Sequence, residues 1–409
     1  MSLVPPRAFR VDRNIRLLYA LGIFSMAQPG FTVWVVDLLD FRHLTLTQVG
    51  IMEAFFWGVK LLIEVPSGAV ADRFGRRASF WLGLVIEGSG VAIFAFASNF
   101  PLLLLSYVLW SAGFSFRSGN DQAYLYDALA AEDRGAEFTS RAGVLNALST
   151  GSYMLAGMLG GWLADVTSLQ IAMLVGVSSY VVGAGILAMM QEPPRAVGNE
   201  AHLPYAETLR TAFRAISADR LTRYALLTQI FVQTGFVAGV LLAQPFMQQH
   251  RVDLALFGVL QAPASLAGAL ASVASARVGR WLGIHWLTAV AIAMAVAGLG
   301  LLAAVDNIWA FTGFIAVQIS IGLAMPAIGG YVNDRTDSNV RATIMSVVPL
   351  GSSLTFMFLG PFAGALGDRS LQLAFGALGA LVLVTSVVSL LLWRRAEIAA
   401  QSAHIEASA

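Results

Sequence analysis

The stretch that decides the fold is Gly68-Ala-Val-Ala-Asp-Arg-Phe-Gly-Arg-Arg77. This short and strongly charged segment separates two apolar runs, residues 55–66 and 78–96. Apolar helices of this kind, joined by a loop with one acid and three arginines, are expected to lie in a membrane with the loop at its surface. The segment therefore predicts a membrane hairpin.

The composition supports this interpretation along the whole chain. Of the 409 residues, 57% are hydrophobic and only 12% are charged, whereas soluble proteins carry about 25% charged residues. Net charge is +1, which gives no reason to expect a nucleic-acid partner. The chain has no cysteine, and its five histidines are scattered without a metal-ligand spacing. We therefore expect no metal site and no cofactor.

Apolar runs of about 20 residues, the length that crosses the hydrocarbon core, occur twelve times. They lie at about residues 15–39, 47–67, 78–98, 101–128, 138–163, 168–190, 221–247, 254–275, 284–304, 308–332, 341–366 and 371–393. Backbone groups in lipid must be bonded internally, so each run is expected to be a helix. The first run is too long for a signal-peptide core, and we interpret it as a retained helix. The predicted fold class is an all-α membrane protein with 12 transmembrane helices.

Basic residues predict the orientation of these helices. Most of the 25 lysines and arginines lie before the first run, after the last run or in alternate loops. The opposite side of the membrane has only Arg42, Arg251 and Arg369. Because basic loops stay in the cytoplasm, both termini are predicted to be cytoplasmic. We expect an integral, multi-pass protein of a bacterial inner membrane.

The sequence also divides into two related halves. Ser168-Leu-Gln-Ile-Ala172 matches Ser370-Leu-Gln-Leu-Ala374, and Tyr124-Leu-Tyr-Asp127 matches Tyr331-Val-Asn-Asp334, in the same order and at similar offsets. We therefore predict an N-terminal six-helix bundle (residues 1–190), a linker (191–220) and a C-terminal six-helix bundle (221–409).

The linker contains a candidate amphipathic helix. Leu209, Phe213 and Ile216 recur at spacings of four and three, while Arg210 and Arg214 point elsewhere. Such a helix lies on the inner leaflet of the membrane, or it packs only against protein. Both interpretations stay open at this stage.

The charged segment resembles the G-x-x-x-D-R-x-G-R-[RK] signature between helices two and three of the major facilitator superfamily. The resemblance extends over residues 14–394. It implies two pseudo-symmetric bundles, a central cavity lined by helices 1, 4, 7 and 10, and transport by alternating access. It further implies that the charged segment is a conformational latch that steadies the outward-facing state.

The predicted latch consists of Gly68, Asp72, Arg73, Gly75, Arg76 and Arg77, with Asp127 as the acidic partner. We expect Gly68 to allow a close backbone approach where the helix ends. Pro66 is expected to help end that helix, since it cannot donate a backbone hydrogen bond. Asp72 is expected near the start of the next helix, where the helix dipole favours an anion. The alternative is that the arginines only anchor the topology.

Charged residues inside the apolar runs are functional candidates because their burial in lipid is costly. Lys60 and Glu87 are expected at similar depths, so they can form a buried ion pair, and Lys60 can also pair with Glu64 four residues further on. Arg117 and Asp121 share one face of the fourth helix, and Arg117 with Gly119 resembles the superfamily's helix-four arginine motif. That resemblance implies a part in proton coupling; a purely structural pair is the alternative.

Two further acids, Asp37 and Glu53, are expected nearer the outer face, where they form a gate or are solvated. The second half offers amides rather than charges in its apolar runs. We predict an amphipathic substrate cavity lined by Gln28, Trp34, Trp110, Phe114, Gln229, Gln233, Phe236 and Gln318.

Glycine-rich stretches resemble part of the G-P-x-x-G-G signature of drug–proton antiporters. The fifth run contains Gly157-Met-Leu-Gly-Gly161 without the proline, and the eleventh contains Gly360-Pro-Phe-Ala-Gly364. Close helix packing explains the same glycines without reference to transport.

The leading hypothesis is a proton-coupled antiporter that exports amphipathic or lipophilic small molecules. The alternatives are a selective metabolite transporter or facilitator of the same fold, and a non-transporting membrane receptor or lipid translocator. No phosphate loop, nucleophile motif or metal cluster indicates an enzyme. The expected partners are a small-molecule substrate, protons and the lipid bilayer, and we expect a monomer.

Overall fold

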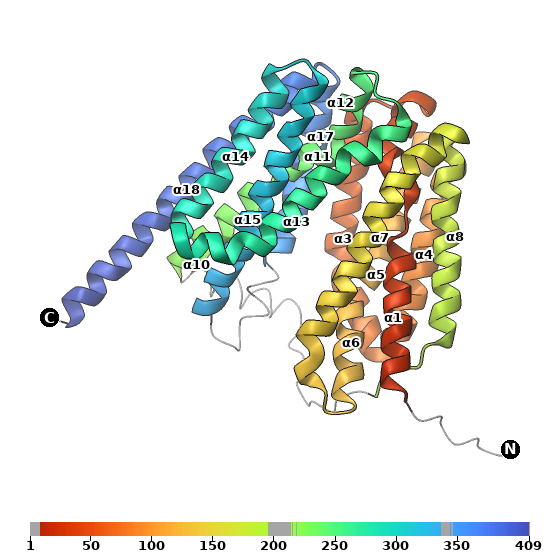
Figure 1. Ribbon diagram of the computed structural model, residues 1–409, viewed down its shortest axis with the longest axis horizontal. Coiled ribbons are helices and arrows are strands. Elements are labelled where there is room, and N and C mark those ends of the chain that lie inside the picture. The colour runs from red at the N-terminus through yellow and green to blue at the C-terminus, as the bar shows by residue number, and fades with distance from the viewer. Residues whose placement is uncertain are drawn as a thin grey trace. The chain divides into compact units, whose positions relative to one another are not determined.

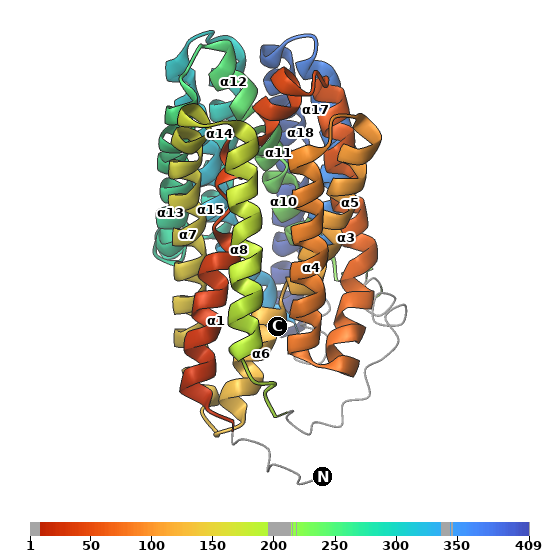
Figure 2. The same ribbon diagram turned by 90° about the vertical axis from the view of Figure 1, so that its right-hand side faces the viewer.

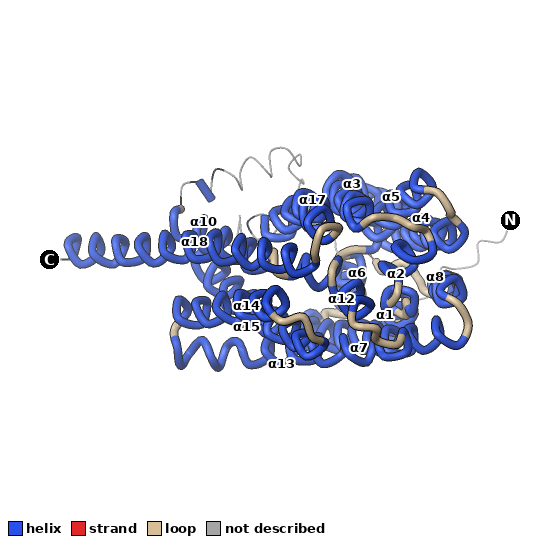
Figure 3. Tube along the Cα trace, turned by 90° about the horizontal axis from the view of Figure 1, so that it is seen from above, coloured by secondary structure: helices blue, strands red, loops and turns tan. Residues whose placement is uncertain are grey.

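The computed structural model describes residues 9–194, 214, 216, 217, 219–336, 344 and 347–408. Every regular element within these residues is a helix (Figure 3). The main helices are α1 (Val11–Met26), α3 (Leu46–Phe74), α4 (Arg76–Phe96), α5 (Phe100–Arg117), α6 (Asn120–Ala130), α7 (Phe138–Val166), α8 (Leu169–Met189), α10 (Arg220–Gln233), α11 (Phe236–Leu241), α12 (Ala243–Gln249), α13 (Phe257–Leu282), α14 (Ile284–Ala304), α15 (Thr312–Arg335), α17 (Val347–Gly367) and α18 (Leu371–Ser408).

The helices agree with the predicted all-α membrane fold. Among the described residues, 10 helices are long and apolar enough to cross a membrane. Two expected runs are not among them. The run at 15–39 is interrupted, and α7 is rich in glycine and hydroxyl residues, which lower its hydropathy. At the other end of the chain, α18 continues to Ser408, well past the expected boundary near residue 393.

Three expected helices are broken rather than continuous. The first stops at Met26 and is followed by a short helix, η1 (Pro29–Thr32), because Pro29 has no N–H to continue the helical ladder. The fourth is divided into α5 and α6 by Gly119, whose φ of +72° suits glycine. The seventh is divided into α10, α11 and α12.

The chain forms two compact units. Unit 1 comprises Met1–Asp37, Gly58–Ala201 and Leu254–Gly258. In this unit α1 lies beside α7 and α8, and α4 lies beside α5 (Figures 1 and 2). Glycine allows α4 and α5 to cross closely: a Cβ on Gly113 of α5 would lie 2.3 Å from the backbone nitrogen of Glu87 on α4.

Unit 2 comprises Leu38–Trp57, His202–Asp253 and Val259–Ala409. Its core includes Trp393, whose side chain is fully buried among residues of α10, α14 and α15. The first turns of α3 belong to this unit and are capped by Asp368, which accepts hydrogen bonds from the backbone nitrogens of Leu46 (2.7 Å) and Thr47 (3.0 Å). Of the predicted amphipathic helix of the linker, Leu209, Arg210 and Phe213 lie outside the described residues, whereas Arg214 and Ile216 are helical and Ile216 packs against the core of unit 2.

Candidate functional site

Most of the charged signature is helical. Helix α3 runs through Pro66 and ends at Phe74, so the expectation that Pro66 helps to end it is wrong. Proline removes one helical hydrogen bond, and a 29-residue helix tolerates that loss here. Gly68 is also not a point of close approach, because a Cβ there would meet open space. Asp72 lies in the last turn of α3, not at the start of α4.

Gly75 is the single residue between α3 and α4. Its φ of +102° lies in the region that favours glycine. A Cβ at this position would lie 2.5 Å from the Glu192 carboxylate, which accepts hydrogen bonds from the backbone nitrogens of Arg76 (2.6 Å) and Arg77 (3.0 Å). Glu192 therefore caps the N-terminus of α4, where the helix dipole favours an anion. No motif in the sequence indicates this role of Glu192.

The arginines of the signature bind three different elements. Arg76 Nε lies 3.2 Å from Asp127 Oδ2 on α6, the partner expected from the sequence, and Arg76 Nη1 lies 3.3 Å from Asp72 Oδ1. Arg77 donates hydrogen bonds to the carbonyl oxygens of Leu187 (3.0 Å) and Ala188 (3.1 Å) at the end of α8. The segment thus joins α3, α4, α6 and α8 within unit 1. Its role as a latch stays a prediction.

The remaining arginine of the signature does not share these contacts. Arg73 is exposed, and its guanidinium lies 5.5 Å from the centroid of the neighbouring Phe74 ring. It therefore joins no helix pair in the way that Arg76 and Arg77 do.

A buried ion pair joins α4 to α5. Arg117 Nε lies 2.5 Å from Glu87 Oε2, and Arg117 Nη2 donates to Glu87 Oε1 at 3.1 Å. The Tyr180 hydroxyl of α8 donates to the same Oε1 at 2.9 Å. The Arg117 and Glu87 side chains are only 8% and 3% exposed, so the charges are enclosed and fully hydrogen-bonded. The expected pairing of Glu87 with Lys60 is wrong.

Lys60 has a different environment. Its ammonium lies 5.5 Å from the centroid of the Phe114 ring, at a distance suited to a cation–π interaction. Lys60 also interacts electrostatically with Glu64, one turn further along α3. Of the two acids considered from the sequence, Glu64 is therefore the one that acts electrostatically on Lys60, and the buried ion pair with Lys60 stays a prediction.

Asp121 lies in the first turn of α6, just after the break at Gly119. Its carboxylate accepts a hydrogen bond from the backbone nitrogen of Gln122 at 2.8 Å. The charge of Arg117 acts on Asp121, but the ion pair of Arg117 is made with Glu87. The predicted coupling pair is thus close in space without direct contact, and its function stays a prediction.

The acids expected near the outer face are buried, so the alternative that they are solvated is wrong. Asp37 is 3% exposed and Glu53 is 9% exposed. Glu53 Oε2 accepts a hydrogen bond from Trp57 Nε1 at 3.1 Å. Within the described ranges, no arginine, lysine or histidine nitrogen lies within 4 Å of the Glu53 carboxylate.

The residues around Glu53 in unit 2 are aromatic. The ring centroids of Trp57 and Phe356 are 4.6 Å apart, and those of Phe356 and Phe236 are 5.8 Å apart. Phe236, predicted from the sequence as a cavity residue, therefore belongs to an aromatic cluster beside a buried carboxylate. Composition did not indicate this cluster, because its members come from α3, α11 and α17.

The other cavity candidates of unit 1 are buried around the broken first helix. Gln28, Trp34 and Trp110 are 5%, 6% and 5% exposed. Gln28 Nε2 donates to the carbonyl oxygen of Gly176 at 3.5 Å, and the Trp110 ring centroid lies 4.7 Å from that of Phe31. These side chains hold the interrupted segment against α5 and α8.

In unit 2 the amide candidates lie on α10 and α15. Gln229 Nε2 donates to the carbonyl oxygen of Met325 at 3.3 Å, and Gln233 Oε1 accepts from the Ser352 hydroxyl at 2.8 Å. Gln229 Oε1 is buried without a partner among the described residues. Gln318 is half-buried. Whether these amides contact a substrate stays a prediction.

These features define a class: an integral, multi-pass membrane protein with interrupted helices and a few buried charges. The chain matches the sequence profile of the Major Facilitator Superfamily over residues 17–348, and it belongs to that family.

Relatives match over short segments. The uncharacterised MFS-type transporter YxaM of Bacillus subtilis is 30% identical over 115 residues, which are 28% of this chain and 27% of the relative. The quinolone resistance protein NorA of Staphylococcus aureus (strain MRSA252) is 25% identical over 154 residues, 38% of this chain and 37% of the relative. The matches thus span well under half of these relatives.

Solved structures resemble the whole chain. A bacterial homologue of the human lysosomal transporter Spinster has a TM-score of 0.74 at 16% identity, covering 94% of this chain and 97% of that chain. The nucleoside transporter NupG has a TM-score of 0.72 at 11% identity, covering 95% and 99%. At these identities the likeness supports the fold alone.

Proposed function

We propose that this protein is a proton-coupled secondary transporter that exports amphipathic or lipophilic small molecules by alternating access. Support comes from its membership of the superfamily and from its partial similarity to NorA, a quinolone resistance protein. In this proposal residues 1–190 and 221–409 are two bundles that rock about the linker at 191–220. The protein acts as a monomer in a bacterial inner membrane with both termini in the cytoplasm.

The observation that carries proton coupling is the buried Glu53 carboxylate. A coupling group must gain and lose a proton as its surroundings change, and intramembrane carboxylates are the usual residues for this task. Glu87 is held by a guanidinium and a phenol, whereas Glu53 accepts a single described hydrogen bond, from Trp57. Glu53 is therefore the better candidate, and Asp121 with Arg117 is the second one.

The experiment is a proton-flux assay in proteoliposomes with a pH-sensitive dye inside and a chemically broad panel outside, including quinolones and lipophilic cations. We expect several amphipathic compounds to evoke proton movement. Glu53→Gln should abolish that movement while leaving folding intact, since glutamine keeps the size and the hydrogen bond. Asp121→Asn tests the second candidate, and Asp165→Asn, at an exposed position at the end of α7, is the control.

Three results would contradict the proposal. Full proton coupling in both Glu53→Gln and Asp121→Asn would remove the assigned coupling residues. Flux of one compound class without any proton movement would favour a selective facilitator. Ligand binding without flux would favour a receptor.

A further inference from the structure

A cavity of about 620 Å³ opens at the start of α1 in unit 1. Its lining includes Arg10, the extended residue just before α1, and Arg13 and Arg16, which lie three residues apart on α1 and are therefore neighbours on its surface. All three side chains are exposed. Phe9 and Leu17 add apolar surface to the same cavity.

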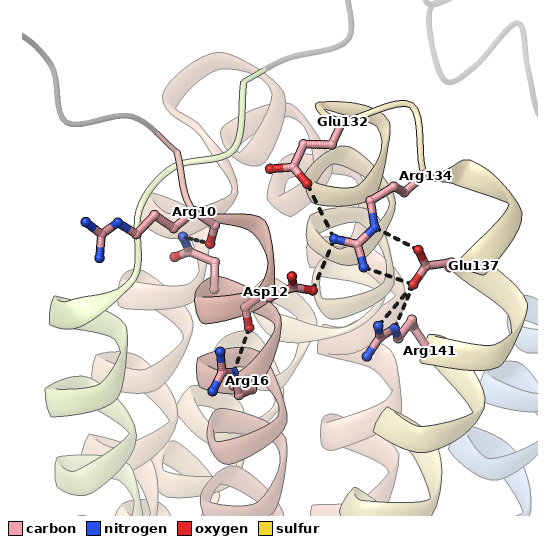
Figure 4. Close-up of polar contacts among 8 residues, drawn as sticks. Arg10, Asp12, Arg16, Glu132, Arg134, Glu137 and Arg141 are labelled. Atoms are coloured by element: carbon pink, nitrogen blue, oxygen red, sulfur yellow. Dashed lines mark hydrogen bonds and ion pairs between the residues drawn. The ribbon is translucent and has the colours of Figure 1, made fainter.

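The acids of this cavity are already paired. Arg134 Nη1 lies 3.1 Å from Asp12 Oδ1 and 3.4 Å from Glu132 Oε2 (Figure 4). Arg134 Nε also lies 2.7 Å from Glu137 Oε1, and Arg141 Nη2 lies 3.0 Å from Glu137 Oε2. Hydrogen bonds from Arg134 and Arg141 lower the pKa of Glu137 to about 2, so this carboxylate stays ionised at neutral pH.

Arg10, Arg13 and Arg16 are left without an acidic partner among the described residues. Arg16 Nε donates to the backbone oxygen of Asp12 at 3.3 Å. Across the part of the chain that the structure describes, no carboxylate oxygen lies within 4 Å of the Arg10, Arg13 or Arg16 guanidinium. The cavity is therefore lined by three exposed arginines, and guanidinium suits phosphate because it donates two parallel hydrogen bonds.

The location distinguishes a lipid from a free anion. Helix α1 begins at Val11, and buried apolar residues such as Ile15 and Leu18 follow within two turns. The cavity thus lies where a membrane helix leaves the hydrocarbon core, at the depth of the headgroups. The apolar side chains of Phe9 and Leu17 stand beside the arginines, which fits a ligand with a phosphate and acyl chains.

We propose that this cavity is a binding site for the phosphate headgroup of an anionic phospholipid. Arg10, Arg13 and Arg16 bind the phosphate oxygens, while Arg134 holds Asp12 and Glu132 away from it. The site lies within unit 1, and it depends neither on the transported substrate nor on proton coupling. Its failure and the failure of the proposed function are therefore separate results.

The test measures lipid binding to the purified full chain in a neutral detergent. Short-chain phosphatidylglycerol is titrated while the thermal unfolding midpoint is followed, with phosphatidylcholine and inorganic phosphate as separate arms. We expect phosphatidylglycerol alone to raise the midpoint. Replacing Arg10, Arg13 and Arg16 together with glutamine should weaken its apparent affinity about 100-fold, since each basic side chain near an anionic lipid contributes about fivefold.

The matched control replaces Arg280, Arg394 and Arg395 with glutamine, because these are also exposed arginines without a described acidic partner. This control should bind phosphatidylglycerol like the unaltered chain. If the triple variant of α1 does not fold, Arg13→Gln alone should weaken binding about fivefold. Unchanged affinity in the α1 variants, an equal loss in the control, or an equal shift with inorganic phosphate would each overturn the proposal.

Discussion

Arg117 and Glu87 form the most enclosed charge pair among the described residues, at 8% and 3% exposure. Removing one partner of such a pair leaves an uncompensated buried charge, which costs about 3–5 kcal/mol. We therefore expect Glu87→Gln to lower the free energy of unfolding by about that amount in denaturant titrations. The double variant with Glu87→Met and Arg117→Met should recover most of the loss.

Asp165→Asn is the control for this prediction, because Asp165 is an exposed acid at the end of α7. It should change the free energy of unfolding by less than about 1 kcal/mol. Equal effects of Glu87→Gln and Asp165→Asn would show that burial of the pair does not matter for stability.

Individual residues also show how far sequence reasoning reaches. The contact of Arg76 with Asp127 was predictable, because opposite charges at one helix end and its neighbouring loop meet at the same membrane surface. The contact of Glu87 with Arg117 was not predictable, because the depth of a residue along its helix does not determine which neighbouring helix its side chain faces. Glu192 was missed because its role depends on where the chain returns after α8.

At the scale of elements, the crossing of α4 and α5 depends on glycine. A Cβ at Gly113 would meet the backbone nitrogen of Glu87 at 2.3 Å, and backbone cannot move aside as a flexible side chain does. We expect Gly113→Ala to destabilise the protein by about 1–3 kcal/mol. It should also disturb the ion pair between Arg117 and Glu87.

The control at this scale is Gly185→Ala on α8, where a Cβ meets open space. Alanine has a higher helix propensity than glycine, so this variant should be neutral or slightly stabilising. The thermal unfolding midpoints of Gly113→Ala and Gly185→Ala, each compared with that of the unaltered chain, test this prediction. A neutral Gly113→Ala would mean that the two helices separate without cost.

The positions of helices were predictable where a run of apolar residues defines the helix, and less predictable where no such run does. Runs of apolar residues located the helices because a membrane demands closed hydrogen bonding along each span. Breaks inside a span depend on single residues such as Pro29 and Gly119, which many helices tolerate. The extension of α18 to Ser408 is polar and leaves no hydropathy signal.

At the scale of the whole molecule, the internal repeat reappears as repeated contacts. In unit 1 the Tyr124 hydroxyl donates to the carbonyl oxygen of Gln191, just after α8, at 2.5 Å. In unit 2 the Tyr331 hydroxyl donates to Glu397 Oε1 on α18 at 3.1 Å. These tyrosines occupy matching positions in the repeat. Each half therefore uses one phenol to bind its own last helix or the residues just after it.

This repetition predicts local effects that stay within each unit. Tyr124→Phe should increase backbone hydrogen exchange after α8, because the buried Tyr124 hydroxyl donates its single proton to the Gln191 oxygen at 2.5 Å and its loss leaves that oxygen short of a donor. The expected cost is about 1–3 kcal/mol. Tyr331→Phe should increase exchange only near Glu397, and by less, since His285 also contacts that carboxylate.

Hydrogen-exchange mass spectrometry checks both variants, with Tyr126→Phe as the control at a tyrosine that is 53% exposed. The double variant of Tyr124 and Tyr331 should show the sum of the two local effects, because distant sites without shared partners add. Faster exchange at the end of α18 in Tyr124→Phe alone would contradict this independence. It would mean that the regions bound by Tyr124 and Tyr331 are energetically coupled. Such coupling is required of a latch that acts on both halves.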